Sequence, residues 1–274
     1  MGIMSERFVV SRDGGELAGE RWPGGSPVVV LLHQGVADRR AWRETASHLA
    51  PAVTVVSYDR RGFGESAPGH EPFSHVDDLI AVLGQVADDP VWLAGASAGG
   101  GVALDAAIVA PERIAGLVLI GSAVSGAPEP ELDPGTQRLG TLLDQAIAAG
   151  DLDEVNRLET WLWLDGPAQP EGRVFGPARS LALDMNGAIL RGGAPEDAGG
   201  SGVDAWSCLE EVRVPVTVAC GDLDVPFLIS QNRALAERLP RCRYQVLPGV
   251  AHLPNLEQPE MLARVVADAV NEGP

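Results

Sequence analysis

A short apolar run that leads into the pentapeptide Gly-Ala-Ser-Ala-Gly constrains this chain more than any other feature. Residues 91–94 have strand character, and a helical apolar pattern begins at Val102. A serine in such a strand-to-helix turn has a strained backbone, so the positions two before and two after it must be almost free of side chain. Gly95 and Gly99 meet that demand. The pattern predicts a nucleophile elbow at Ser97, and its alternative is a glycine-rich turn that only opens a buried helix.

Other glycine-rich loops do not fit this segment. A phosphate-binding P-loop requires a lysine, and the chain has none among its 274 residues. A dinucleotide fingerprint requires a second glycine where Ser97 stands. Because all 20 basic residues are arginine, Schiff-base and Ser-Lys chemistries are excluded as well.

Charge and composition limit the classes of molecule that the protein can bind. The chain has 20 basic and 38 acidic residues, a net charge of -18, which predicts no nucleic-acid partner and no membrane binding. The odd number of cysteines argues against a disulfide framework. No apolar stretch approaches a membrane span, and residues 1–7 lack the apolar core of a signal peptide, so we expect a cytoplasmic protein.

Strand-like apolar runs alternate with helical patterns, which predicts an α/β fold with a mostly parallel, doubly wound, eight-stranded sheet. The first two runs, joined through Asp13-Gly14-Gly15, are typical of an antiparallel N-terminal hairpin. The eight expected strands are residues 8–11, 17–22, 28–32, 53–58, 91–94, 116–120, 214–219 and 243–247.

The strand rhythm stops after the sixth strand. From about residue 125 to 212 no long strand run occurs, and Pro- and Gly-rich joints separate apolar helical pieces. These pieces are too apolar to remain solvated. We therefore expect a helical cap at 125–212, inserted between a first core part at 1–124 and a second core part at 213–274.

Polar side chains follow three of the expected strands. Ser97 follows one, Asp222 and Asp224 follow a later one, and His252 follows the last, so all should gather at the carboxyl edge of the sheet. A serine hydroxyl needs a histidine to accept its proton and a carboxylate to orient that histidine. From the residues alone either aspartate could supply the carboxylate.

Together these motifs resemble the α/β-hydrolase-fold serine hydrolases, a group of esterases, lactonases and cofactor-free haloperoxidases. The motifs, in the family's order, are His33-x-Gly35, Asp59-x-Arg61-Gly62-x-Gly64-x-Ser66, Gly95-x-Ser97-x-Gly99, Gly221-x-x-Asp224 and Gly249-x-x-His252. The resemblance implies a catalytic triad of Ser97, Asp224 and His252, with Asp222 as a turn residue.

The resemblance also implies roles for the other loops. The oxyanion hole would be formed by the N–H groups of Gly35 and Ala98. His33 would be structural, although it is the second candidate for the base. Asp59 would order its loop together with Arg61.

The expected substrate pocket combines the first loop with the cap. Gln34 stands where the family usually has glycine and could reach into the site, with Val36 beside it. Trp161, Trp163 and Leu164 would supply an apolar wall from the cap. His48, His70 and His75 show no metal-binding spacing, so we expect neither a metal nor a cofactor.

These features predict a hydrolase that cleaves small, apolar carboxylic esters or lactones through an acyl-enzyme. Two related activities use the same triad: the perhydrolysis of cofactor-free haloperoxidases and carbon-carbon bond hydrolysis. A ligand-binding or signalling protein built on this scaffold is the alternative from another class. A homodimer is possible, although nothing in the sequence indicates one.

Overall fold

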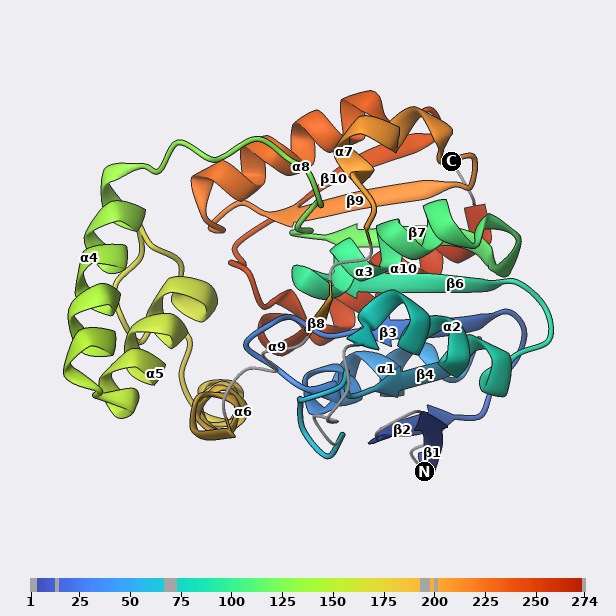
Figure 1. Cartoon of the computed structure of the whole chain (residues 1–274), viewed down its shortest axis with the longest axis horizontal. Helices are drawn as coiled ribbons and strands as arrows, with labels where there is room; N and C mark the ends of the chain where they lie inside the picture. Colours follow the sequence, from blue (N-terminus) through green and yellow to red (C-terminus); the bar gives the residue numbers. More distant parts are fainter. Residues whose placement is uncertain (1–3, 13–14, 67–72, 193–197, 200–201, 273–274) are drawn as a thin grey trace.

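The computed structural model describes residues 4–12, 15–66, 73–192, 198–199 and 202–272, and a twisted eight-stranded sheet lies at its centre (Figure 1). The strand order is β1-β2-β4-β3-β6-β7-β9-β10. Strands β1, β2 and β4 pair antiparallel, and all other neighbours are parallel. The strands are β1 (Glu6–Arg12), β2 (Gly15–Trp22), β3 (Val28–Leu32), β4 (Thr54–Tyr58), β6 (Val91–Ala96), β7 (Ile114–Ile120), β9 (Val216–Gly221) and β10 (Cys242–Leu247).

The sheet confirms the predicted fold class, including the N-terminal hairpin. Arg12 pairs with Gly15 at the end of the hairpin, while Asp13 and Gly14 of the predicted turn lie outside the described residues. Strands β4 and β6 are buried along their whole length, which is why they carry no charged side chain and are mostly apolar.

Helices cover both faces of the sheet and bury its two apolar surfaces. One face packs on α2 (His75–Val86), α3 (Ala98–Val109), α7 (Ala205–Cys208) and α8 (Pro226–Arg238). The other face packs on α1 (Arg43–Leu49) and α10 (Pro259–Glu272). The described part of the chain has no helix that is long and apolar enough to cross a lipid bilayer. Short helical turns complete the core: η1 (Arg39–Trp42), η2 (Pro111–Arg113), η4 (Leu209–Glu211) and α9 (Pro254–Glu257).

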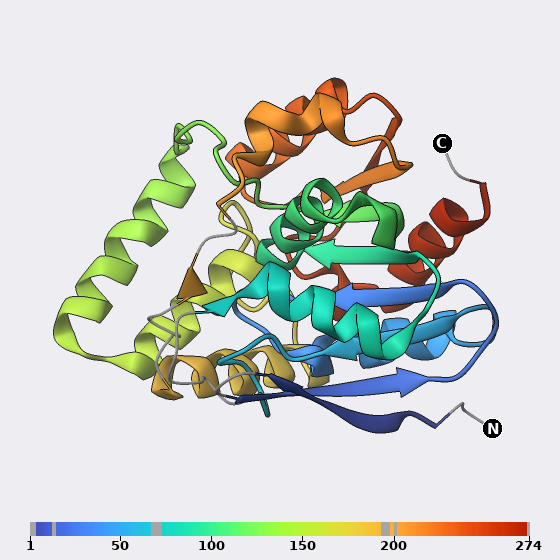
Figure 2. The same ribbon diagram turned by 45° about the vertical axis from the view of Figure 1, so that its right-hand side comes forward.

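The helical insertion follows β7, the sixth strand of the large sheet. It contains α4 (Pro134–Ala149), α5 (Leu152–Thr160), η3 (Trp161–Asp165) and α6 (Pro177–Gly192), and α4 is the outermost cap helix (Figures 1 and 2). A short strand, β8 (Ala198–Gly199), pairs with β5 (Phe73–Ser74) of the core. Asp133 and Asp151 cap the first two helices, and Gly150 in the left-handed conformation separates them.

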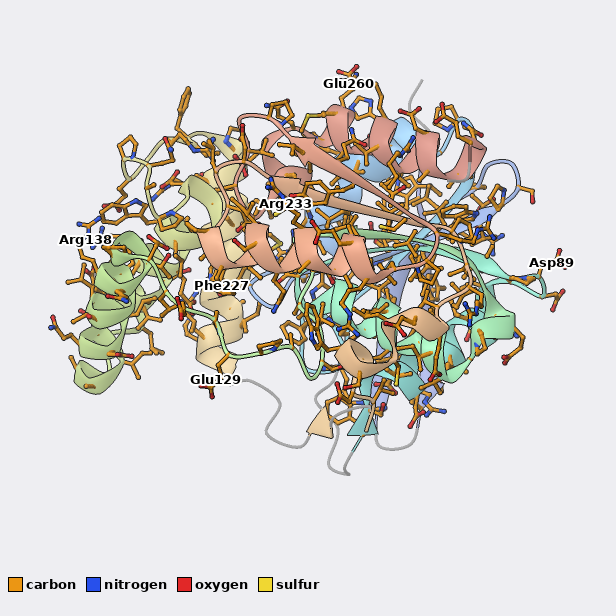
Figure 3. The ribbon with its side chains drawn as sticks, turned by 90° about the horizontal axis from the view of Figure 1, so that it is seen from above. Asp89, Glu129, Arg138, Phe227, Arg233 and Glu260 are labelled. Carbon is orange, nitrogen blue, oxygen red and sulfur yellow. The ribbon has the colours of Figure 1, made fainter. Side chains whose placement is uncertain are left out.

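The two ends of the insertion meet at Ser125. Its carbonyl oxygen accepts the Trp206 N–H at 2.9 Å, and its hydroxyl oxygen accepts the Ala205 N–H at 3.1 Å. The cap limits at 125–212 remain a prediction, although Leu209 and Val212 pack in the same core cluster as residues of α3. Figure 3 shows that the cap lies at one end of the molecule: Arg138 on α4 lies at that end, and Asp89, in the turn before β6, lies at the opposite end.

Candidate active site

The turn between β6 and α3 has the strained geometry that the sequence predicts. Ser97 has φ 54° and ψ -123°, and among the residues the structure describes it alone combines a positive φ with a side chain. A Cβ on Gly95 would overlap the Gly99 backbone, and one on Gly99 would lie 2.5 Å from the Leu32 carbonyl oxygen. The glycines therefore let strand, helix and β3 approach, and the Ser97 side chain makes no capping bond to α3.

His252 and Asp224 form a buried pair at the ends of β10 and β9. His252 Nδ1 lies 2.9 Å from Asp224 Oδ2, and the two side chains are 3% and 1% exposed. The second carboxylate oxygen accepts the Val225 N–H at 2.7 Å. Because a carboxylate only accepts hydrogen bonds, the Nδ1 atom carries the proton and Nε2 remains the basic nitrogen. Asp222 instead accepts the Gly249 N–H at 2.7 Å, as expected for a turn residue.

Gly121 brings the Ser97 turn and the Asp224–His252 pair together. The Ser97 N–H donates to the Ile120 carbonyl oxygen at 2.9 Å. A Cβ on the next residue, Gly121, would lie 2.9 Å from Asp224 Oδ2 and 3.2 Å from His252 Nδ1. The pair therefore packs directly on the backbone that also holds the Ser97 turn.

His33 serves as a structural residue of the first loop. Its Nδ1 donates to the Gln34 carbonyl oxygen at 2.7 Å, and its Nε2 accepts the Arg60 N–H at 3.0 Å. Complete burial, together with the nearby Arg60 charge, lowers the pKa of His33 well below its usual value. Both ring nitrogens are engaged, so the second candidate for the base has no free nitrogen.

Gln34 ties the first loop to the histidine loop. Its amide donates to Asn255 Oδ1 at 2.8 Å, and the Asn255 amide donates back at 3.3 Å. Both side chains are buried. This loop also lies against the Ser97 turn, because a Cβ on Gly99 would come within 2.6 Å of the His33 carbonyl oxygen. Gly35, the predicted oxyanion donor, follows directly in this loop.

The loop after β4 corrects one expectation. Asp59 orders this loop by accepting the N–H groups of Arg39 at 2.7 Å and Glu65 at 2.8 Å, and it also pairs with the Arg39 guanidinium. Arg61, its predicted partner, pairs with Asp78 on α2 at 2.9 Å. The difference arises because η1 carries Arg39 over the end of β4, which sequence spacing does not reveal.

A wide helical turn at η3 places Trp163 over His252. The Gly166 N–H donates five residues back to the Trp161 carbonyl oxygen at 3.0 Å. Four residues after Trp163 stands Pro167, which has no N–H to donate. The Trp163 carbonyl oxygen accepts the His252 N–H at 3.0 Å instead, and the two rings lie 4.7 Å apart.

A small cavity lies beside Trp163, where cap and core meet. The volume that the centre of a water molecule can occupy in it is about 10 Å³, so it has space for about one water molecule. Its lining residues are Val36, Glu159, Thr160, Trp163, Ala182, Asn186 and Leu253.

Two of the five predicted pocket residues, Val36 and Trp163, line this cavity. Gln34 is held by Asn255, and Leu164 is fully buried against Ala182 and Leu253. Trp161 packs within the cap, where its indole N–H donates to the Gln169 carbonyl oxygen at 2.9 Å. These three side chains are therefore held in other contacts and do not line the cavity.

Arg173 connects the cap to the histidine loop. Its guanidinium donates to the carbonyl oxygens of Asp165 and Leu164, both at 2.7 Å, and pairs with the Glu257 carboxylate. Glu257 in turn accepts the N–H of Ala251, the residue before His252, at 2.8 Å. Burial raises the pKa of the Glu257 carboxyl to about 7, although Arg173 acts in the opposite direction.

Several of these residues were not predicted from the sequence. Asn255 and Glu257 lie just after His252, so their place near the site could have been inferred from the sequence. Glu159 and Arg173 are scattered in the cap and carry no motif. Pro167 could have indicated the unusual turn, because it has no N–H to donate to the Trp163 carbonyl oxygen.

Possible metal ligands are dispersed. The described residues contain no group of three or more His, Cys, Asp or Glu side chains that could hold a metal ion. His48 lies on α1 and His75 begins α2, while His70 falls outside the described residues.

The alpha/beta hydrolase family matches residues 29–265 of this chain. A Bacillus subtilis protein named provisionally as a 2-succinyl-6-hydroxy-2,4-cyclohexadiene-1-carboxylate synthase is 27% identical, over 90% of this chain and 91% of its own. The pimeloyl-acyl-carrier-protein methyl ester esterase of Vibrio campbellii is 28% identical, over 86% and 92%.

Solved structures share the fold. A bromoperoxidase from Bacillus anthracis superimposes with a TM-score of 0.76 at 24% identity, over 98% of this chain and all of that one. Because the family match spans most of the sequence, including every loop that carries the site, the chain belongs to the alpha/beta hydrolase family.

Proposed function

We propose that the protein is a serine hydrolase that cleaves small carboxylic esters or lactones through an acyl-enzyme. One observation carries the proposal: the strained Ser97 turn packs on the same backbone as the buried Asp224–His252 pair. A hydroxyl on a strained strand-to-helix turn beside an oriented imidazole is the arrangement that activates serine.

In the first step Ser97 Oγ attacks the ester carbonyl carbon while His252 Nε2 takes its proton. Asp224 holds the Nδ1–H and stabilises the imidazolium that forms. The N–H groups of Ala98 and Gly35 hold the oxyanion of the tetrahedral intermediate. Losing one such donor typically costs about 3 kcal/mol of transition-state stabilisation.

Collapse of the intermediate breaks the ester C–O bond, and His252 gives its proton to the leaving oxygen. Water then attacks the acyl-enzyme with His252 again as base, releasing the acid and restoring Ser97 Oγ–H. The family relationship supports this chemistry, since one relative is named as a methyl ester esterase.

The cavity at the cap interface, whose Trp163 wall contacts the His252 ring, favours a small group on the substrate. Val36, Trp163 and Leu253 form an apolar wall, and the cavity has space for about one water molecule. We therefore expect short acyl or alcohol groups to react faster than long ones.

The test is hydrolysis of p-nitrophenyl acetate, butyrate and octanoate, with the pre-steady-state burst recorded. We expect a burst followed by steady turnover, with acetate and butyrate faster than octanoate. Both phases should vanish in Ser97→Ala and persist in Ser47→Ala, an exposed serine on α1 whose hydroxyl donates to the Glu44 carbonyl oxygen.

Ester release that survives Ser97→Ala would contradict the proposal. Equally, no serine-dependent release from any of the esters would contradict it and would direct attention to ligand binding. Repeating the assay with hydrogen peroxide distinguishes perhydrolysis, because peracid would then form in place of part of the acid.

A further inference from the structure

The cavity beside Trp163 has one charged lining residue, Glu159 at the end of α5. It is half-buried, and Asn186 on α6 donates to its Oε2 at 2.7 Å. The same Asn186 amide contacts Asn156 Oδ1 at 3.1 Å, and the Asn156 amide donates to the Leu183 carbonyl oxygen at 2.9 Å. This network between α5 and α6 fixes the carboxyl at the cavity.

Glu159 is a half-buried carboxylate with no arginine partner among the described residues, whereas arginines hold several of the more deeply buried carboxylates. Arginines pair with Glu20, Asp59, Asp78, Asp165 and Glu257. All 20 arginines of the chain lie in its described part, and none forms an ion pair with Glu159. Burial accordingly raises the pKa of the Glu159 carboxyl, with only the Asn186 hydrogen bond opposing it.

A partly desolvated carboxylate without a cationic partner is less favourable than one that a cation compensates. The cavity offers two further features that favour such a cation. The Trp163 ring forms one wall and can make a cation–π contact, and the Thr160 side chain adds a polar group. The net charge of -18 attracts cations to the whole molecule.

We propose that Glu159 binds an alkylammonium group of the substrate, so that the preferred esters carry a cationic N–H donor on the acyl or the alcohol side. This inference rests on the proposed ester hydrolysis. The ammonium would donate to Glu159 while its alkyl chain runs along Trp163 and Leu253 towards the reacting carbonyl. Because the free volume is small, Trp163 or Val36 must shift when the group enters.

The test uses pairs of esters that differ only in this charge. Ethyl 6-aminohexanoate is compared with ethyl heptanoate, and 2-(dimethylamino)ethyl acetate with 3-methylbutyl acetate. Values of kcat/KM are measured at pH 7.5 for wild type, Glu159→Gln and Glu154→Gln. Glu154 is the matched control, because it lies on the same helix but pairs with Arg157 at the surface.

We expect wild type to prefer the ammonium member of at least one pair by about tenfold to a hundredfold, the worth of one charge-assisted hydrogen bond. Glu159→Gln, which keeps the shape and the contact with Asn186, should abolish the preference, and Glu154→Gln should retain it. Equal rates within both pairs in wild type, or an unchanged preference in Glu159→Gln, would overturn the proposal.

Binding to Ser97→Ala separates this inference from the proposed function. If no ester is turned over, the proposed hydrolysis fails, and calorimetry of 2-(dimethylamino)ethyl acetate against 3-methylbutyl acetate still decides the role of Glu159. Tighter binding of the ammonium ester that is lost on adding Glu159→Gln supports the cation site. Equal binding of the two esters overturns it.

Discussion

At the scale of single residues, two aspartates follow β9 and only one contacts His252. Asp224 holds the imidazole, whereas Asp222 holds the Gly249 N–H. We predict that Asp224→Asn lowers kcat by about 10²- to 10⁴-fold, because an amide can present its N–H to Nδ1 and stabilise the wrong tautomer. Asp222→Asn, the matched control, should keep kcat within a few-fold. The reverse ranking in an ester assay would assign the orienting carboxylate to Asp222.

The burial of His33 predicts how the stability of the fold depends on pH. Its folded-state pKa is depressed, so below pH 6.5 the unfolded chain binds more protons than the folded one. The stability that the neutral His33 contributes is fully present above pH 6.5 and is lost as pH falls, by at most about 1.4 kcal/mol per pH unit. The free energy of unfolding, measured with urea at several pH values between 6.5 and 5, should therefore fall less steeply with decreasing pH in His33→Asn than in wild type.

The control for this pH experiment is His48→Asn, which removes an exposed imidazole from α1. Its free energy of unfolding should change with pH as in wild type. If His33→Asn also shows the wild-type pH dependence, protonation of the buried ring does not limit acid stability.

At the scale of secondary-structure elements, glycine spacing controls how closely β6 and α3 approach the first loop. Gly99→Ala should destabilise the fold by about 1–3 kcal/mol, since its Cβ would meet the Leu32 and His33 carbonyl oxygens. Gly84→Ala in the middle of α2 is the matched control, because a Cβ there meets nothing within 4 Å. Relief of glycine's entropy cost should make that variant about 0.5–1 kcal/mol more stable.

Thermal or urea unfolding of both variants checks this prediction. A Gly99→Ala protein as stable as Gly84→Ala would mean that the turn can open without cost, contrary to the close packing described above.

The link from the cap through Arg173 to the histidine loop makes a prediction about catalysis. Arg173→Met should lower kcat by about tenfold or more with little change in KM, because Glu257 would lose the cation that fixes it against Ala251. Arg173→Lys should recover part of the rate. Arg191→Met, an exposed cap arginine, serves as control. Unchanged kcat in Arg173→Met would show that this link does not position His252.

The sequence was sufficient to predict most elements but not all of their details. Apolar runs predicted the inner strands, the glycine turn predicted the N-terminal hairpin, and the Gly-x-Ser-x-Gly pattern predicted the turn at Ser97, because all three depend on local chemistry. The wide turn at η3 was not predicted. Its free carbonyl is satisfied by the His252 N–H, almost 90 residues away in the chain, and local propensity does not contain that partner.

At the scale of the whole molecule, the position of the candidate site followed from topology. In a parallel sheet the loops after β6, β9 and β10 share one edge, which is why the sequence could predict that Ser97, Asp224 and His252 gather there. The cavity wall could not be predicted in the same way. Its residues come from four separated segments, and their orientation depends on how the cap packs on the core.

The central claim is that Ser97 is a nucleophile activated by His252. The most direct measurement is mass spectrometry of the protein after reaction with a fluorophosphonate, with peptide mapping of the adduct. We predict one adduct per chain on Ser97, none in Ser97→Ala, and labelling slowed by at least about a hundredfold in His252→Ala. An adduct on another residue, or labelling equally fast without His252, would contradict the account.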